Sequence, residues 1–298
     1  MPDPLIGISI SDRGVQAVEL SRNGLNASLL AIDEWVNPFP VDADGITPER
    51  VEAFAEALGR FLSVNRIRAR RTSMALDTGF LFLQRVPADP DAPREAVLDQ
   101  IRWEIGQYHP GMEPGAFLSD FHRMKPASAG PAEEVLAVSL RKESVRSLTR
   151  ALTALGLTVQ IIDADHFSAE TALRINYPDI FRRTLALVGV KENRLDVSVL
   201  RNGNLEGYSY RAPSSNQEIV ETIGAISRET PGILSVMVYG PYLDTDLLQQ
   251  IRRGSALLVE AMNPLRHVAV ADSIRMAEHL TAPSYRFASA IGAALRRE

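Results

Sequence analysis

The chain of 298 residues carries 32 Lys and Arg residues against 37 Asp and Glu residues, a net charge of −5 at pH 7. This acidic balance argues against a general nucleic-acid-binding protein, because such proteins usually carry a basic excess. The absence of cysteine excludes a disulfide scaffold, a thiolate zinc site, an iron–sulfur cluster and a cysteine nucleophile. No apolar run approaches the roughly 20 residues of a membrane span, and the first residues lack a signal-peptide pattern, so a folded cytoplasmic protein is expected.

The first quarter of the sequence predicts three strands, a helix and a fourth strand. Extended runs at 5–10, 15–20 and 29–36 are separated by a polar turn and by Asn23-Gly24, a dipeptide typical of tight hairpins. Thr47-Pro48 then resembles a helix start, since proline is tolerated at the first helical position. Apolar residues recur with helical spacing as far as Leu62, and a strand is expected at 73–76.

The remaining elements favour an α/β fold, because short helices and strands alternate along the chain. The middle predicts a compact α+β unit with strands at 80–86, 117–124 and 135–140 and helices over 97–108 and 145–155. A break at Tyr177-Pro178-Asp179 separates this part from the rest. Beyond it we expect strands at 185–190, 195–200, 205–210 and 233–239, a helix around Ile223 and a closing helix over 285–297.

A self-similarity about 180 positions apart is the most informative feature of the sequence. Residues 8–15 and 188–195 each run from a strand through a polar turn into a second strand, and Asn-Gly then precedes a third. The pattern indicates a duplicated lobe, with two unrelated meanders as the alternative. In a duplicated fold the two polar turns would face each other across a cleft, where the phosphates of a nucleotide could sit.

These features resemble the actin-like ATPase superfamily and, within it, the PilM family of type IV pilus assembly. Residues 7–20 read GISISDRGVQAVEL, where that family typically has G-I-D-I-G-x-x-x-V-K-x-V-E-L. The segments 101–110, 163–167, 263–265 and 287–295 are also similar to the family. The resemblance implies an α/β fold of two actin-like lobes with an inserted small α+β subdomain.

The same resemblance implies a division of the chain into five segments. These are 1–77 as the first part of lobe I, 78–160 as the inserted subdomain, 161–178 as the return to lobe I, 179–284 as lobe II, and 285–298 as a closing helix on lobe I.

The first phosphate-binding block departs from the family pattern. The resemblance aligns Ser9 with an Asp that orients Mg²⁺, usually through water, and Ser11 with a glycine that lets the backbone approach a phosphate. Gln16 stands where the family has a lysine, a point charge for phosphate. Asp12 is a charged residue in the same turn and could be a displaced substitute.

The second phosphate-binding block and the glycine-rich segment that holds the adenosine in the family also depart from the family pattern. Gly189 stands where an Asp is expected, and Lys191 stands where a glycine is expected and could be another displaced substitute. Gly240 survives from a glycine-rich stretch, but Pro241 after it removes a backbone donor. The carboxylate that would position the attacking water corresponds best to Asp165.

Without the two metal-orienting carboxylates, most of the electrostatic stabilisation of phosphoryl transfer is lost. The sequence therefore predicts a pseudo-ATPase with no catalytic residue, no metal and no bound cofactor. The alternative is an active ATP-binding protein that uses ATP with Mg²⁺ through Asp12, Asp163 and Asp165, or a nucleotide-dependent filament protein similar to FtsA. The two readings differ in whether these three carboxylates converge in the cleft.

The resemblance implies a cytoplasmic scaffold of a type IV pilus or related secretion machine. PilM-type proteins receive the short N-terminal cytoplasmic tail of a single-span inner-membrane partner, the PilN role. A peptide groove needs backbone donors and apolar pockets, so this function can survive the loss of the ATP motifs. We expect association with the inner membrane through partners, contacts with other machine components, no nucleic acid and possible homo-oligomers. No groove residue can be assigned from the sequence.

Three further features of the sequence have both a structural and a functional interpretation. His166, next to Asp165, is interpreted as a packing residue near the lobe interface, and the five histidines show no zinc motif. Trp103 and Tyr108 are interpreted as core residues and not as part of a peptide groove. The basic run 66–71 is typical of a solvated loop, or it could touch acidic lipid or an acidic partner.

Overall fold

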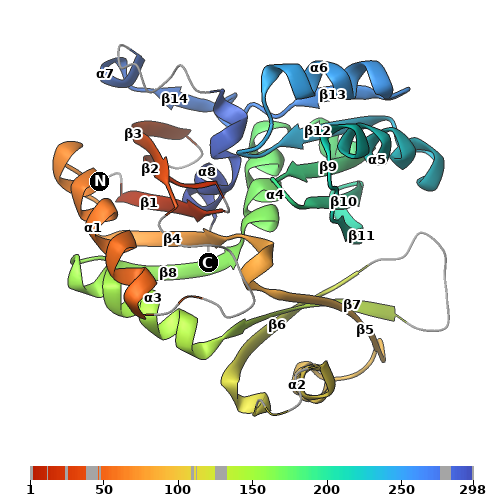
Figure 1. The fold of residues 1–298 in the computed structure, drawn as a ribbon, viewed down its shortest axis with the longest axis horizontal. Coiled ribbons are helices and arrows are strands. Elements are labelled where there is room, and N and C mark those ends of the chain that lie inside the picture. The colour runs from red at the N-terminus through yellow and green to blue at the C-terminus, as the bar shows by residue number, and fades with distance from the viewer. Residues whose placement is uncertain are drawn as a thin grey trace.

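The strands that the structure describes form three sheets (Figure 1). The structure is a computed structural model that describes residues 3–11, 13–23, 26–37, 46, 48–108, 111, 113–124, 133–275 and 283–296. Among the described helices, none combines the length and the apolar character that a membrane span requires.

The first sheet has six strands in the order β14-β3-β2-β1-β4-β8. They are β1 (Asp3–Ile10), β2 (Gly14–Asn23), β3 (Asn26–Val36), β4 (Arg71–Leu76), β8 (Thr158–Ala164) and β14 (Val268–Val270). Apolar residues of α1 (Pro48–Val64) and α3 (Lys142–Ala154) pack with one set of its side chains. α4 (Asp165–Asn176) and α8 (Ala288–Leu295) pack with another set. β1 is buried on both faces, which explains its continuous apolar run.

The second sheet has five strands in the order β11-β10-β9-β12-β13. They are β9 (Thr184–Val190), β10 (Leu195–Arg201), β11 (Asn204–Arg211), β12 (Ser235–Tyr239) and β13 (Leu258–Ala261). The helices α5 (Asn216–Glu229) and α6 (Thr245–Gly254) pack on this sheet and begin at the caps Ser215 and Asp244, whose side chains accept backbone N–H bonds.

The predicted duplication is confirmed by the topology. In the first sheet, β1 pairs antiparallel with β2 and parallel with β4, the strand that follows α1. In the second sheet, β9 pairs antiparallel with β10 and parallel with β12, the strand that follows α5. Ser9 pairs with Gln16 as Gly189 pairs with Asp196. The two turns are closed alike, by bonds of 2.9 Å from Ser11 N to Gly14 O and from Lys191 N to Arg194 O. Gln16 and Asp196 are therefore equivalent positions.

The third sheet belongs to a small α+β unit inserted between β4 and α3. Its strands are β5 (Phe82–Ala88), β6 (Phe117–Arg123) and β7 (Glu133–Arg141) in the order β5-β7-β6, and α2 (Arg94–Tyr108) packs on it. The core interpretation of Trp103 and Tyr108 is wrong, since they are 61% and 69% exposed. The buried stripe of α2 is made by Val97, Leu98, Ile101 and Ile105. Trp103 lies two positions from Ile101, about 200° around the helix, and so faces away from the core.

The structure also differs from the predicted segment boundaries. β14 pairs with β3, so the chain returns to the first sheet at Val268, before the predicted boundary at 285. β8 spans the predicted boundary between 160 and 161. The closing segment starts as the 3₁₀ turn Ser284–Phe287 and continues as α8. The other short helices are η1 (Thr78–Phe80), η2 (Pro114–Ala116), η3 (Ile180–Arg182) and α7 (Asp272–Arg275).

Candidate functional site

The two repeated turns face each other between the lobes, as the duplication predicts. Arg13 in the first turn has Nη2 4.0 Å from Oε1 of Glu192 in the second turn. The same guanidinium lies 4.6 Å from the ring centroid of Tyr242, which follows β12. The space where a nucleotide would meet both turns is therefore bounded by side chains of both lobes.

Lys191 extends from the second turn into a set of four oxygen-bearing side chains, and it is only 1% exposed. Its Nζ lies 2.7 Å from Thr78 Oγ1, 2.8 Å from Asp196 Oδ2, 3.0 Å from the carboxyl group of Asp165 and 3.2 Å from Asp77 Oδ1. We call these five residues the Lys191 cluster. Since Asp77 and Thr78 follow β4 and Asp165 begins α4, a lysine of the second sheet binds residues that extend from the first.

The local backbone fixes each partner of the lysine. Asp77 caps η1, where its Oδ1 also accepts the N–H of Gly79 at 2.8 Å. Thr78 Oγ1 donates to Asp196 Oδ2 at 2.8 Å. The other oxygen of Asp196 accepts bonds of 2.9 Å from Arg194 and 2.5 Å from the hydroxyl of Tyr208. These bonds hold the carboxylates around the ammonium, although Asp77 Oδ2 is buried without a hydrogen-bond partner among the described residues.

Burial and charge set different protonation states within the cluster. Burial raises the pKa of Asp165 to about 8, although Lys191 acts in the opposite direction. Burial also acts to raise the pKa of Asp196, but Lys191 and Arg194 outweigh it and hold that pKa well below its usual range. Burial acts to lower the pKa of Lys191, and the carboxylates around it raise it well above its ordinary value. At neutral pH Asp165 therefore keeps a proton while Lys191 is charged.

Tyr239 closes the other side of this space. A Cβ placed on Gly189 would lie 2.7 Å from the Tyr239 hydroxyl, so this position has no room for an aspartate. The hydroxyl lies 2.9 Å from His166 Nδ1, and His166 Nε2 lies 2.8 Å from Ser198 Oγ. Burial lowers the pKa of His166 to about 4, which makes the imidazole neutral at pH 7. His166 thus packs at the lobe interface, as interpreted from the sequence.

The candidate residues of the first block lie apart from the Lys191 cluster. Ser9 is buried on β1, and the hydroxyl of Ser11 donates to Gly14 O at 2.9 Å within its own turn. Gln16 Nε2 donates to Glu34 Oε1 at 3.0 Å. Among the described residues, none of these three hydrogen-bonds to the cluster, and Asp12 lies outside the described residues.

Gly240 has a structural reason to be glycine. Its φ is +132°, and a Cβ there would lie 2.3 Å from the carbonyl oxygen of Val190. Its N–H donates to the carbonyl of Tyr285 at 3.2 Å, which ties the end of β12 to the turn before α8.

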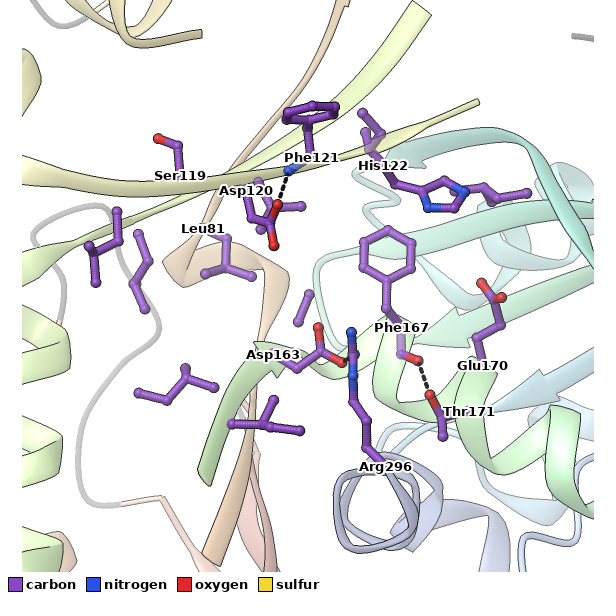
Figure 2. Close-up of a pocket in the computed structure, with 18 of the residues that line it drawn as sticks. Leu81, Ser119, Asp120, Phe121, His122, Asp163, Phe167, Glu170, Thr171 and Arg296 are labelled. Atoms are coloured by element: carbon purple, nitrogen blue, oxygen red, sulfur yellow. Dashed lines mark hydrogen bonds and ion pairs between the residues drawn. The ribbon is translucent and has the colours of Figure 1, made fainter. Parts of the chain in front are cut away.

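Asp163 and Asp165 diverge, although only one residue separates them. Asp165 belongs to the Lys191 cluster, whereas Asp163 accepts a 3.0 Å bond from Ser168 Oγ and pairs with Arg296. The two described carboxylates of the ATPase alternative therefore do not converge. Asp163 instead faces a groove on the other side of the β8–α4 junction (Figure 2).

This groove has a volume of about 860 Å³ and lies between the inserted unit, α3, β8 and α4. Much of its lining is apolar, contributed by Leu81, Leu118, Val138, Val159, Ile161 and Phe167. β6 and β8, which border it, are outer strands of their sheets, so each leaves one edge unpaired among the described residues. The groove is therefore bordered both by apolar side chains and by two outer strands.

Charged side chains mark one end of the groove. Figure 2 shows Arg296 beside Asp163, with Asp120 of β6 on the opposite side. Burial lowers the pKa of the Arg296 guanidinium, and Asp120 acts against this effect. On α4, Glu170 Oε1 lies 3.0 Å from Arg174. Acidic and basic groups thus alternate around the opening.

Sequence reasoning missed Asp77, Thr78 and Asp196, which hold the lysine. The signal for Asp196 lay in the repeat, since the hairpin register places it opposite Gly189. Asp77 and Thr78 follow directly after an apolar strand, a position where polar groups reach the end of a sheet. The groove had no sequence signal, because its walls come from separate segments.

Comparison with known proteins gives one family and one fold. The sequence profile of the family described as type IV pilus assembly protein PilM matches residues 7–211. A chain from a PilM–PilN type IV pilus biogenesis complex is similar in structure, with a TM-score of 0.80 and 19% identity over 98% of this chain and 97% of that one.

Two other solved structures share the fold more distantly. A Bacteroides thetaiotaomicron protein with an actin-like ATPase fold has a TM-score of 0.55 at 11% identity, over 92% of this chain and 95% of that one. The cytoplasmic domain of EpsL, an inner-membrane component of the Vibrio cholerae type II secretion system, has a TM-score of 0.52 at 10% identity, over 95% and 100%. The fold is thus that of the actin-like ATPases. Because the family profile covers more than half of the sequence, the chain belongs to the PilM family of type IV pilus assembly proteins.

Proposed function

We propose that this chain is a scaffold of type IV pilus assembly that binds the N-terminal cytoplasmic tail of a PilN-like inner-membrane protein in the groove between β6 and β8. The observation that carries the proposal is the pair of sheet edges bordering one apolar groove. An extended peptide can add to such an edge through main-chain hydrogen bonds, while alternate side chains enter apolar pockets. Binding of this tail would hold the protein at the cytoplasmic face of the membrane.

The dimensions suit a short tail. β8 has seven residues, and a strand rises about 3.3 Å per residue, so the edge is roughly 23 Å long. That length accommodates about six or seven extended peptide residues. Leu118, which is 49% exposed, lines the groove from β6, and Phe167 lines it from α4. The partner tail is therefore expected to carry alternating apolar side chains.

We also propose that the protein is a pseudo-ATPase that binds neither nucleotide nor Mg²⁺. The residues between the lobes do not fit a magnesium nucleotide. The Lys191 ammonium already occupies the oxygens of Asp77, Asp165 and Asp196. A phosphate placed there would meet these carboxyl groups, and Tyr239 fills the space over Gly189. Partner binding in the groove needs none of these groups.

The groove proposal is tested with a synthetic peptide of the N-terminal cytoplasmic sequence of PilN from the same organism. Calorimetry should show binding to the wild-type protein and at least a tenfold weaker affinity for Leu118→Asp. Leu234→Asp is the matched control, because Leu234 is 58% exposed but lies outside the groove, before β12. Equal affinities of the two variants would overturn the placement of the tail in the groove.

The pseudo-ATPase proposal is tested with ATP and Mg²⁺ at millimolar concentration. No heat of binding and no thermal shift are expected. A ligand present at a hundred times its dissociation constant would stabilise the fold by about 2.7 kcal/mol, a readily measured change. A Mg²⁺-dependent shift that Lys191→Met removes would show that the cleft binds nucleotide and would refute the proposal.

A further inference from the structure

The end of lobe I where α1 and α3 finish is strongly basic. Residues 57–71 and 146–158 hold seven arginines and no acidic residue, although the whole chain has a net charge of −5. The two segments lie side by side, because Thr158 N donates to Arg70 O at 2.8 Å and a Cβ on Gly59 would lie 3.4 Å from Leu155. Figure 1 shows α1 and α3 as neighbours on this part of the first sheet.

Five arginines of this end are exposed and have no ion pair among the described residues: Arg66, Arg68 and Arg70 after α1, and Arg146 and Arg150 on α3. Arg68 and Arg70 alternate with the buried Ile67 and Ala69, so both side chains project outward. In an extended chain such positions lie about 7 Å apart. We call Arg66, Arg68 and Arg70 the arginine stripe.

The backbone beneath the stripe is held in place. Glu19 is buried, and its Oε1 accepts the N–H of Arg68 at 3.1 Å and of Ala69 at 3.0 Å. Arg66 has a φ of +51°, a left-handed conformation that favours glycine after a helix. An arginine at this position supplies an exposed guanidinium group at the cost of some backbone strain. The backbone that carries the stripe is thus held in place, and its three arginine side chains are exposed.

We propose that this end of lobe I, centred on the arginine stripe, binds anionic phospholipid headgroups at a membrane surface. Guanidinium groups pair well with phosphate, and each basic residue near an anionic membrane strengthens binding by about fivefold. Val64, at the end of α1, is 78% exposed beside the stripe. A membrane interface accepts one apolar side chain at any point, whereas an acidic protein surface would need a matching pocket.

Such binding is weak by itself and depends on where the charge is located. The net charge of the chain is negative, so an anionic surface repels the molecule as a whole and attracts only its basic end. The stripe would therefore orient the protein on a membrane. This inference does not rest on the tail-binding groove, which runs along β8 from Val159 to Ala164 and is lined by none of the three stripe arginines.

The test is co-sedimentation of the purified protein with vesicles of phosphatidylglycerol and phosphatidylethanolamine, with phosphatidylcholine vesicles for comparison. Arg68→Gln with Arg70→Gln should lower the partition coefficient on anionic vesicles by about 25-fold, and 0.5 M salt should have a similar effect. Arg228→Gln with Arg253→Gln is the matched control, since both arginines are exposed on lobe II, and binding should stay within twofold.

Arg66→Gly separates folding from binding. Glycine fits the left-handed conformation, so this variant should melt at a higher temperature than the wild type while binding anionic vesicles about fivefold more weakly. The proposal is overturned if the wild type does not bind anionic vesicles, or if both double variants bind alike. It is equally overturned if the stripe proves to bind an acidic peptide such as polyglutamate while vesicles do not compete.

Discussion

The Lys191 ammonium lies 3.0 Å from the carboxyl group of Asp165, and this contact links the hairpin of the second sheet to the helix that follows the first. The duplicated fold predicts that the phosphates of a nucleotide would sit between these two turns. Here a side chain of the protein supplies the cation, and three carboxyl groups surround it. The lobes are therefore joined by an internal ionic contact that needs no ligand.

Removal of this internal cation should strongly destabilise the fold. Lys191→Met leaves buried carboxyl groups without their partner, a change that typically costs about 3–5 kcal/mol. Urea unfolding measures the loss. Lys142→Met, at a half-buried lysine outside the cluster, should stay within about 0.5 kcal/mol of wild type. Similar losses for the two variants would contradict a structural role of the Lys191 cluster.

Asp165 should give the protein a distinctive dependence on pH. Its pKa is about 8 in the fold against 3.8 as the ordinary value, so the folded state binds an extra proton between these pH values. The contribution of Asp165 to the free energy of unfolding is fully present below about pH 4, and it is lost as the pH rises towards 8. His166 acts oppositely, since its pKa of about 4 makes stability rise from pH 4 to 6.5.

Of Asp165 and His166, only Asp165 changes the stability between pH 6.5 and 8. The melting temperature of the wild type should therefore fall over that range, and the fall should be much smaller in Asp165→Asn. Scanning calorimetry in matched buffers at pH 6.5, 7.2 and 8.0 measures both curves. Parallel curves for the two proteins would mean that Asp165 is ionised throughout.

Much of the fold follows from local patterns, whereas the cluster depends on strand register. Turn dipeptides and alternating apolar runs predicted the two meanders and their duplication. Lys191 and Asp165 were identified one by one as altered family positions, but Asp77 approaches the lysine from 114 residues away in the sequence. The parallel pairing of β4 with β8 places Asp77 beside Asp165, and the pairing of β9 with β10 places Asp196 near the turn that carries Lys191.

Trp103 shows a different limit of the sequence. Large aromatic residues are usually buried, but the 3.6-residue period of α2 assigns the core to Val97, Ile101 and Ile105. β14 was missed for another reason, since three residues are too few for a periodic signal. The groove between β6 and β8 had no local signature, because it forms where separately folded units meet.

The close contact between Gly189 and Tyr239 should appear as an energetic coupling. Gly189→Ala places a methyl group against the Tyr239 ring and should destabilise the protein by about 1–3 kcal/mol. Tyr239→Leu alone loses its bond to His166 and part of its packing. In the double variant the smaller side chain makes room for the methyl group, so the combined loss should be less than the sum by about 0.5–3 kcal/mol. Strict additivity in urea unfolding would show that the two residues do not touch.

Binding of the partner tail should protect specific backbone groups from exchange. If the peptide adds to a sheet edge, the amides of β6 or β8 that face the groove become hydrogen-bonded and exchange more slowly with deuterium. Hydrogen-exchange mass spectrometry of the protein with and without the PilN peptide measures this change. Peptides from α2 are the internal control, because α2 packs against the third sheet and does not line the groove.

Slower exchange confined to α2, with β6 and β8 unchanged, would place the tail on the exposed Trp103 face instead, and the groove would lose its proposed role. Protection on β8 alone would identify the first sheet as the one that the tail extends, with β6 supplying side-chain contacts such as that of Leu118.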